Sequence, residues 1–440
     1  MQRILRALIA CVVLGLVTVG VRAGGSGLIQ PGASPSDSGG AESVLAIRVM
    51  TFNLEDVRTA DLLDPEHPRL RALAETIQRI RPNILFLNEI AYDLPGGPGV
   101  PADAEAGQNA KRFVENFLSR SQAPGLEPME FAAFMAPSNT GMPSGFDLDN
   151  DGEIVTRYPA PEPNEAGGRP GAQTDAGRAY GNDCWGFGTF PGQYAMALLV
   201  DPRLEIVEDG VRTFQLLPWS YMPGAVLPKS ADEEGGGWYS EEELGFMRLS
   251  SKSHWDVPVR LPNGAVVHVL GSHPTPPAFD GAEQRNKRRN HDEIRFWADY
   301  LEGASYVVDD AGGRGTLRRG ALFVIVGDLN ADSREGTGFG NPMRDLLLGQ
   351  RRVGAFEAPV ADLDLPDLEP TDTALWGKQV DYVIPSREIR VLRSGIWRHE
   401  GVGPGARRMK AESASGFASD HFPVWADLSV PGASGGPGGD

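Results

Sequence analysis

The sequence has almost no cysteine. Its 440 residues include only Cys11 and Cys184. Removal of an N-terminal segment through residue 23 would leave Cys184 alone, so we expect no disulfide within the mature chain. A zinc site built from thiolates is excluded for the same reason. Stability must therefore come from packing, which a hydrophobic fraction of 41% supports.

A long apolar run is also absent. The longest N-terminal stretch, residues 8–19, is too short to span a membrane comfortably, and two arginines precede it. Small residues at 21–23 complete the pattern of a secretory signal. We predict that residues 1–23 are a signal peptide and that the protein is secreted or periplasmic. Almost no apolar stretch precedes Cys11, so a lipid anchor at this residue is disfavoured.

Positive charge is scarce. There are 41 Lys and Arg residues against 59 Asp and Glu residues, which gives a net charge of −18. This balance argues against a protein that wraps nucleic acid by charge alone. It does not exclude a nuclease, because a bound metal supplies local positive charge and an acidic site is what a hard cation needs.

Glycine (55) and proline (35) are abundant, which predicts long loops between the core elements. Residues 24–44 are rich in Gly, Ser and Pro and read as a flexible linker, and residues 431–440 read as a disordered tail. Between them we expect one catalytic domain over residues 45–430. Segments 137–193 and 215–245 lack periodicity, and loops of that length are usually functional or mobile.

The domain alternates between strand-like and helix-like patterns. Helical spacing of apolar residues predicts one helix over residues 70–80 and another that starts near Ala282. Short apolar or alternating runs predict strands at 46–53, 83–89, 265–272, 322–326, 379–384 and 423–428. This mixture predicts a β-sandwich with helices on its outer faces.

Polar residues stand at the ends of these strands, where a rigid sheet can present side chains to a common cleft. They are Asn53, Asn88, Glu89, His273, Asp328, Asn330, Asp381, Asp420 and His421. Any one of them alone is more often a turn former or a structural histidine. Six such strand ends in one chain favour a shared site over coincidence.

The residue types fit one reaction. Carboxylates prefer hard cations, so Glu89 and Asp420 are natural ligands for magnesium or calcium. A histidine titrates near neutrality and can take a proton from water, and a carboxylate such as Asp381 would orient its ring. Asparagine amides can donate to a phosphoryl oxygen as negative charge develops.

The local motifs resemble the endonuclease/exonuclease/phosphatase superfamily, which includes DNase I-like nucleases, neutral sphingomyelinases and inositol-polyphosphate phosphatases. TFNL, NE, SHP, GDLN, DYV and SDHFPV occur in the family's order from Asn53 to His421. Asn88 stands where the family usually has Gln. The resemblance implies an α+β, DNase I-like fold: a four-layer sandwich of two packed, mostly antiparallel sheets flanked by helices.

The resemblance also implies roles for the strand-end residues. The metal, expected to be Mg²⁺ (or Mn²⁺/Ca²⁺), would lie beside Asn53, Glu89 and Asp420. The catalytic residues would be His273, Asp328, Asn330, Asp381 and His421. Within this set, Asp381 and His421 match the general-base pair, and the Asp-x-Asn pair handles the nucleophile and the phosphoryl group. No carboxylate partner for His273 can be placed.

Two further groups of basic residues have open interpretations. Lys252 and His254 lie where family members often supply a phosphate contact, but both fit ordinary exposed strand residues as well. A basic cluster follows His273 at the start of the second helix. It can contact a phosphate-bearing substrate or form a solvated face that pairs with nearby acids. The cluster comprises Arg285, Lys287, Arg288, Arg289 and His291.

An acidic loop has the carboxylate spacing of a calcium site at Asp147, Asp149 and Asp151. The twelfth position of an EF-hand would be Tyr158 rather than Glu, and no flanking helices are expected, so an EF-hand is rejected. A structural Ca²⁺ site and a simple acidic turn both remain open.

The sequence therefore predicts a secreted, metal-dependent hydrolase of phosphate esters, with a phosphodiesterase or nuclease preferred. A phosphomonoesterase or a sphingomyelinase-like phospholipid hydrolase is the alternative on the same fold. The expected substrate is a phosphate ester (nucleic acid, phospholipid or small phosphoester); no protein partner is inferred, and a monomer is expected. A non-catalytic, calcium-dependent binding protein is the alternative of another class, which a general-base pair disfavours.

Overall fold

A computed structural model of the chain describes residues 44–165, 167–230, 236–336, 338–361, 363–398 and 418–433. The predicted signal peptide lies outside the described residues, as does the predicted linker apart from Val44. Of the predicted tail, residues 431–433 are described. Among the helices of the described ranges, none combines the length and the apolar character that crossing a membrane requires.

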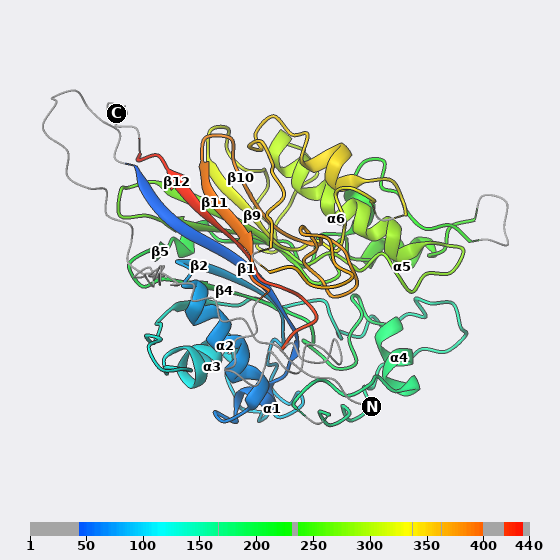
Figure 1. Cartoon of the computed structure of the whole chain (residues 1–440). Helices are drawn as coiled ribbons and strands as arrows, with labels where there is room; N and C mark the ends of the chain where they lie inside the picture. The colour runs from blue at the N-terminus through cyan, green and yellow to red at the C-terminus, as the bar shows by residue number, and fades with distance from the viewer. Residues whose placement is uncertain are drawn as a thin grey trace, which may run out of the picture.

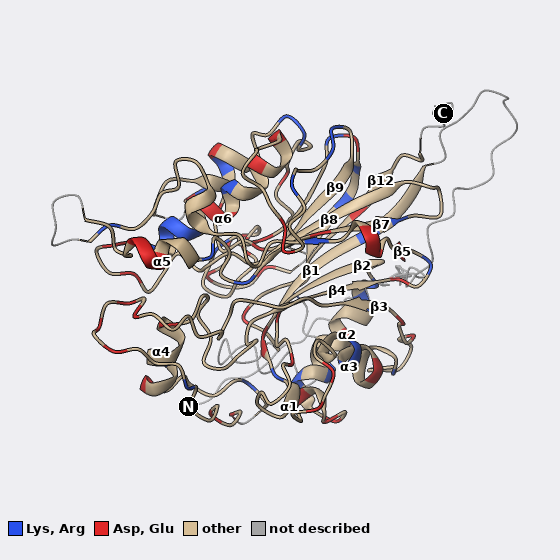
Figure 2. Cartoon of the chain, turned by 180° about the vertical axis from the view of Figure 1, so that it is seen from behind, with Lys and Arg blue, Asp and Glu red and all other residues tan. Residues whose placement is uncertain are grey.

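The first β-sheet has six strands in the order β11-β12-β1-β2-β4-β3 (Figure 1; β3 is labelled in Figure 2). β1 and β2 are parallel, and the other neighbours are antiparallel. The strands are β1 (Leu45–Val57), β2 (Ile84–Ile90), β3 (Ala132–Phe134), β4 (Met196–Val200), β11 (Arg390–Ile396) and β12 (Val424–Val430).

The second sheet follows the order β10-β9-β8-β7-β5, and β6 also pairs with β7. Its one parallel pair is β8 and β9. The strands are β5 (Glu205–Ile206), β6 (Arg212–Thr213), β7 (His254–Arg260), β8 (Val266–Ser272), β9 (Leu322–Asp328) and β10 (Asp381–Pro385). Both sheets are thus mixed and mostly antiparallel, as predicted.

Side-chain alternation along the strands separates three hydrophobic cores. Ile47 and Val49 of β1 face the core between the two sheets, whereas Met50 and Phe52 face the helices outside the first sheet. These helices are α2 (Pro68–Ile80) and α3 (Asn109–Phe113), and α6 (Arg285–Glu302) covers the outer face of the second sheet (Figure 1). The predicted four-layer α+β sandwich is confirmed.

The two long helices have clear local causes. α2 begins at Pro68, and Nδ1 of His67 accepts from the Leu70 amide at 3.5 Å. It ends where Arg81 takes a left-handed conformation (φ 55°). α6 begins at Arg285, three residues later than predicted, because Gln284 is itself left-handed (φ 54°) and cannot continue a helical turn.

The two long segments that lack periodicity contain short helices that the sequence analysis missed. α4 (Asp175–Asn182) starts at a Thr174 cap, and α5 (Glu241–Phe246) starts at a reciprocal capping box between Ser240 and Glu243. The remaining short elements are α1 (Thr59–Leu62), the π-helical turns η1 (Val114–Leu118) and η4 (Met343–Leu347), and the 3₁₀ turns η2 (Glu208–Gly210) and η3 (Trp219–Tyr221).

A charge ladder crosses three strands of the first sheet. Asp427 of β12 lies opposite Arg48 of β1 and Arg393 of β11. Arg48 Nε donates to Asp427 Oδ1 at 2.7 Å, and Arg393 Nη2 donates to Oδ2 at 2.6 Å. Burial alone would raise the pKa of Asp427, but the Arg48 and Arg393 guanidinium groups hold it below its ordinary value.

We predict that Asp427→Asn lowers the free energy of unfolding by about 1–3 kcal/mol at pH 7, because it weakens charge-assisted hydrogen bonds to a buried carboxylate. Since the folded pKa is depressed, this stability is fully present above the unfolded pKa of about 4 and disappears as the pH falls through the folded value. Urea denaturation at pH 7 and pH 3 checks this. If the free energies of unfolding of the wild type and of Asp427→Asn differed equally at both pH values, the prediction would be contradicted.

Candidate functional site

Five strands bring the predicted polar residues together near their ends, although β1 continues past Asn53 to Val57 rather than ending at residue 53 as predicted. Asn53 and Glu89 lie on the parallel strands β1 and β2 of the first sheet. In the second sheet, Asp328 ends β9 and pairs in register with Asp381, which begins β10, while His273 follows β8 directly. Because the two sheets pack face to face, these strand ends meet at one edge of the sandwich.

The carboxylate of Asp328 lies at the centre of this cluster. Its Oδ2 accepts from Nδ2 of Asn53 at 3.1 Å and from Nδ2 of Asn330 at 3.3 Å. Nε2 of His273 and Nε2 of His421 lie 3.4 and 3.6 Å from the same oxygen. Burial alone would raise the pKa of Asp328, but the two imidazoles, and after them the backbone N–H of Asn330, which donates to Oδ1 at 2.8 Å, hold it far below its ordinary value.

His421 and Asp381 form a buried pair. Nδ1 of His421 lies 2.9 Å from Oδ2 of Asp381, which leaves Nε2 on the side of Asp328. Burial alone would lower the pKa of His421, but the negative charges of Asp381 and Asp328 raise it well above its ordinary value. The pair thus has the geometry of an oriented proton acceptor.

Glu89 and Asp420 are the carboxylates predicted to hold a hard cation, and Glu89 lies with His273 and Asp328 in a group whose ligand atoms are within 4.8 Å of one another. Glu89 has a left-handed backbone (φ 61°), and its Oε2 accepts from the Asp56 amide at 3.1 Å. Burial, and next the negative charge of Asp420, raise the pKa of Glu89 to about 7. A divalent cation bound at Glu89 would relieve this repulsion, so the residues present fit a metal site.

Asn53 aligns the carboxylates through its amide nitrogen. Nδ2 donates to Glu89 Oε1 at 3.0 Å as well as to Asp328, while Oδ1 accepts from the Glu55 amide at 2.9 Å. Asn53 therefore belongs to the cluster as a hydrogen-bond donor. Its role as a metal ligand stays a prediction.

The sequence analysis could not place a carboxylate partner for His273, and the structure shows that this partner is Asp328. Glu89 is more distant, with its Oε1 3.9 Å from Nε2 of His273. Burial, and next the positive charge of Lys252, lower the pKa of His273 to about 4. The ring is therefore neutral at pH 7. Its buried Nδ1 has no hydrogen-bond partner among the described residues.

Lys252 belongs to the site and His254 does not. Nζ of Lys252 is buried 3.5 Å from the carbonyl of Pro274, next to His273. Nε2 of His254 instead lies 2.9 Å from the carbonyl of Glu293, and its ring packs against Phe296 with centroids 4.7 Å apart. The expectation of a phosphate contact at His254 is thus wrong, as is the interpretation of both residues as exposed.

Lys252 and His254 lie in different environments because of where β7 begins. This strand begins at His254, and the segment before it is irregular, so strand alternation does not place Lys252 and His254 on one face.

The basic residues of α6, whose lysines and arginines are blue in Figure 2, have mixed environments. Nδ1 of His291 lies 3.0 Å from Oδ1 of Asp292, so this residue pairs with a nearby acid as expected. Arg289 is buried and donates to several backbone carbonyls, including that of Leu249 at 3.1 Å. Arg285 donates to the carbonyl of Leu148 at 3.0 Å. Neither expectation, substrate contact or pairing with nearby acids, describes these two arginines.

The acidic loop at Asp147, Asp149 and Asp151 lies together, with one carboxylate oxygen of each within 4.8 Å of the others. Asn182 of α4 donates to Oδ2 of Asp149 at 2.7 Å. No helix directly flanks the loop, as expected. A structural calcium ion here stays a prediction.

Two residues of the site were given no role from the sequence: Asn88, which was only counted among the strand-end residues, and Trp376, which was missed. Oδ1 of Asn88 accepts from the Asp328 amide at 3.0 Å and so joins the two sheets. The ring of Trp376 meets the ring of His421 edge-on, with centroids 4.9 Å apart, although 51% of Trp376 is exposed. The position of Trp376 five residues before Asp381 carries no recognisable signal in the sequence.

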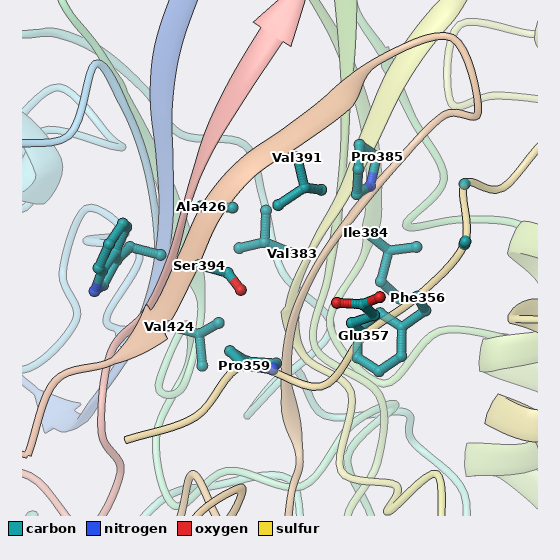
Figure 3. Close-up of a pocket in the computed structure, with 13 residues that line it drawn as sticks. Phe356, Glu357, Pro359, Val383, Ile384, Pro385, Val391, Ser394, Val424 and Ala426 are labelled. Atoms are coloured by element: carbon teal, nitrogen blue, oxygen red, sulfur yellow. The ribbon is translucent and has the colours of Figure 1, made fainter. Parts of the chain in front are cut away.

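A small cavity elsewhere in the sandwich has no part in this site (Figure 3). It lies between β10, β11, β12 and segment 354–359 and has a volume of ≈ 30 Å³, which is room for about one or two water molecules. Its lining includes Val383, Val391 and Val424, and none of the predicted site residues. It is too small and too apolar to hold a phosphate ester.

Comparison with known proteins gives the family. The model of the Endonuclease/Exonuclease/phosphatase family matches residues 50–421, which is well over half of the chain. The chain therefore belongs to the endonuclease/exonuclease/phosphatase family. No curated protein matches the sequence significantly.

Several solved structures are similar. An endonuclease/exonuclease/phosphatase from Beutenbergia cavernae is 16% identical, with 89% of this chain and 73% of that chain covered and a TM-score of 0.44. A family protein from Bacteroides thetaiotaomicron is 12% identical (89% and 97% covered, TM-score 0.41). The human Nocturnin catalytic domain with bound sulfate is 13% identical (88% and 97% covered, TM-score 0.43). At these values the likenesses carry no argument about substrate.

Because Lys252 and His254 lie in different environments, we predict that one variant loses activity and the other loses stability. Lys252→Met, which keeps a long apolar stem in a buried position, should leave the protein folded and lower kcat/KM by about 10-fold or more, because a preorganised positive charge is lost. His254→Leu should lower the melting temperature through lost packing and a lost hydrogen bond, with kcat close to wild type. Turnover of bis-p-nitrophenyl phosphate and thermal melts of both variants test this. The reverse pattern would contradict the assignment.

Proposed function

We propose that the protein is an exported, metal-dependent phosphodiesterase, and that its substrate class is nucleic acid or a related phosphodiester. The observation that carries the proposal is the buried His421–Asp381 pair directed at Asp328, with His273 and Glu89 in the same cluster. The family to which the chain belongs supports phosphoester chemistry. The export signal read in residues 1–23 supports the location.

Proton transfer in this proposal belongs to His421. Asp381 binds Nδ1 and fixes the ring, so Nε2 of the neutral ring is the atom that can take a proton from the attacking water. Because Asp381 and Asp328 raise the pKa of His421, the neutral form that acts as the base becomes more abundant as the pH rises. Nε2 lies 3.6 Å from Asp328, close to where the water must be held. Asp381 also stabilises the imidazolium once the proton has been transferred.

Hydrogen-bond donors that could bind the phosphoryl group lie in the same cluster. The amide of Asn330 and the ring of His273 both lie beside Oδ2 of Asp328. Lys252 adds a positive charge behind His273. Donors held beside the reacting group stabilise negative charge as it grows on the phosphoryl oxygens. The Asn330 amide, which here donates to Asp328 and to the carbonyl of Pro274, would exchange one of these acceptors for a phosphoryl oxygen. A divalent cation held by Glu89 and Asp420 would supply further positive charge to the same oxygens.

A non-catalytic binding protein would have no use for this arrangement. Binding of calcium or of a phosphate needs carboxylates or cations. A histidine that is buried against one carboxylate and directed at another is instead suited to proton transfer. The His421–Asp381 pair therefore favours an enzyme.

We predict that His421→Ala lowers kcat by at least about 100-fold while the protein stays folded, because general-base catalysis contributes on this scale. Asp381→Asn should also lower kcat. The double variant should lose little more than the worse single variant, since the two residues act as a unit.

Steady-state kinetics on bis-p-nitrophenyl phosphate, with melting temperatures of all three variants, measures this. If His421 were only a packing residue, His421→Ala would melt earlier with near-normal turnover. A folded His421→Ala protein with half the wild-type kcat would overturn the proposed mechanism.

We also predict that Glu89→Gln abolishes metal-stimulated turnover and weakens magnesium binding, because the amide keeps the shape of the side chain but removes its charge. Isothermal titration with Mg²⁺ and with Mn²⁺ gives the affinity independently of activity. Glu75→Gln is the matched control: Glu75 is a buried carboxylate on α2 that pairs with Arg79, so metal binding should be unchanged. Wild-type turnover by Glu89→Gln without added metal would reject the assignment.

A further inference from the structure

Helix α6 binds the segment that carries His273 at three points. Nε1 of Trp297 donates to Oγ of Ser272 at 2.9 Å. The Thr275 amide donates to Oε2 of Glu293 at 2.6 Å, and the Thr275 carbonyl accepts from Nδ2 of Asn290 at 2.8 Å. The backbone on both sides of His273 is therefore fixed by one face of this helix.

The same face binds the segment after β9. Nδ2 of Asn290 also donates to the carbonyls of Leu329 at 3.1 Å and Asn330 at 3.4 Å. Asn330 has a left-handed backbone (φ 51°), a conformation that non-glycine residues adopt at some energetic cost. The single amide of Asn290 thus connects the His273 segment to the Asp328–Asn330 turn.

Glu293 adds the third segment. Its Oε1 accepts from the Ser251 amide at 2.6 Å and from the Ser251 hydroxyl at 2.9 Å. Lys252 is the next residue. The Glu293 side chain is fully buried, so its carboxylate binds only groups of the protein, and these groups precede Lys252 and follow His273.

We propose that Asn290 and Glu293 are positioning residues for the phosphodiesterase reaction, which hold Lys252, His273 and Asn330 at their working distances from Asp328. This inference rests on the proposed function. Lys252, His273 and Asn330 all lie beyond strand ends, where backbone hydrogen bonds within the sheet no longer fix the chain. α6 replaces that constraint with buried side-chain contacts.

The physical reason for an effect on rate is geometric. A displacement of about 1 Å in a catalytic group can cost about 100-fold in rate, even when its cause lies away from the reacting atoms. Neither residue contacts the Asp328 carboxylate or the His421–Asp381 pair in any described contact. Loss of either residue should therefore reduce kcat through geometry, while the metal ligands stay in place.

The test compares Asn290→Ala and Glu293→Gln with Asp292→Asn as a matched control. Asp292 is equally buried on the same helix, and it accepts from Nε1 of Trp219 at 2.7 Å and from the Val226 amide at 2.8 Å. These contacts lead to another loop. Glu293→Gln offers one acceptor oxygen where two are needed, so it must release either Ser251 or Thr275.

We expect all three variants to lower the melting temperature, but only Asn290→Ala and Glu293→Gln to lower kcat, by about 10- to 100-fold with KM little changed. Magnesium affinity, measured by titration calorimetry, should equal that of the wild type. Hydrogen–deuterium exchange should rise at residues 272–275 in both variants, at 329–330 in Asn290→Ala, and at 219–226 in Asp292→Asn.

Equal losses of kcat in Asp292→Asn and in the two variants would show a general effect of stability and overturn the inference. Near-wild-type kcat in both Asn290→Ala and Glu293→Gln would overturn it as well. If the wild-type protein hydrolyses no phosphate ester, the proposed function is wrong. If the wild type is active and the variants behave as described above, only this inference is wrong, so the two failures are distinguishable.

Discussion

The site depends on one buried carboxylate. Oδ2 of Asp328 is removed from water, so its charge is tolerated only because hydrogen-bond donors and imidazoles surround it. Asn53 comes from the first sheet, Asn330 and His273 from the second, and His421 from the segment before β12. Because the buried Oδ2 of Asp328 needs these donors, and they come from both sheets, its contacts join the two sheets at this edge.

Much of this arrangement could be predicted from the sequence, because strand-end residues have a definite place once a sandwich is assumed. Asp328, Asp381 and His421 do lie together. Lys252 and His254 show where such reasoning stops: only the start of β7 decides which of them faces the site, and no residue marks that start. The Ser240–Glu243 capping box, in contrast, was readable in a segment that we expected to be irregular.

The contacts of α6 could not have been predicted at all. Arg289, Asn290 and Glu293 bind mainly backbone groups, and every residue of a chain has these groups. A sequence pattern therefore cannot say which carbonyl a buried amide will reach. The charges on this helix favoured contact with solvent or substrate, whereas burial assigned Arg289 to the protein interior.

The pairing of β1 with β12 has a consequence for the newly made chain. Leu45 lies opposite Val430, so the first strand gains one of its two neighbours only from the last. The hydrogen bond from Asn53 to Asp328 already spans 275 positions, and His421 arrives later still. Contacts this distant in sequence form slowly. A chain of this topology can bring His421 to Asp381 and Asp328 only after residue 421 has been made, so shorter chains lack this pair.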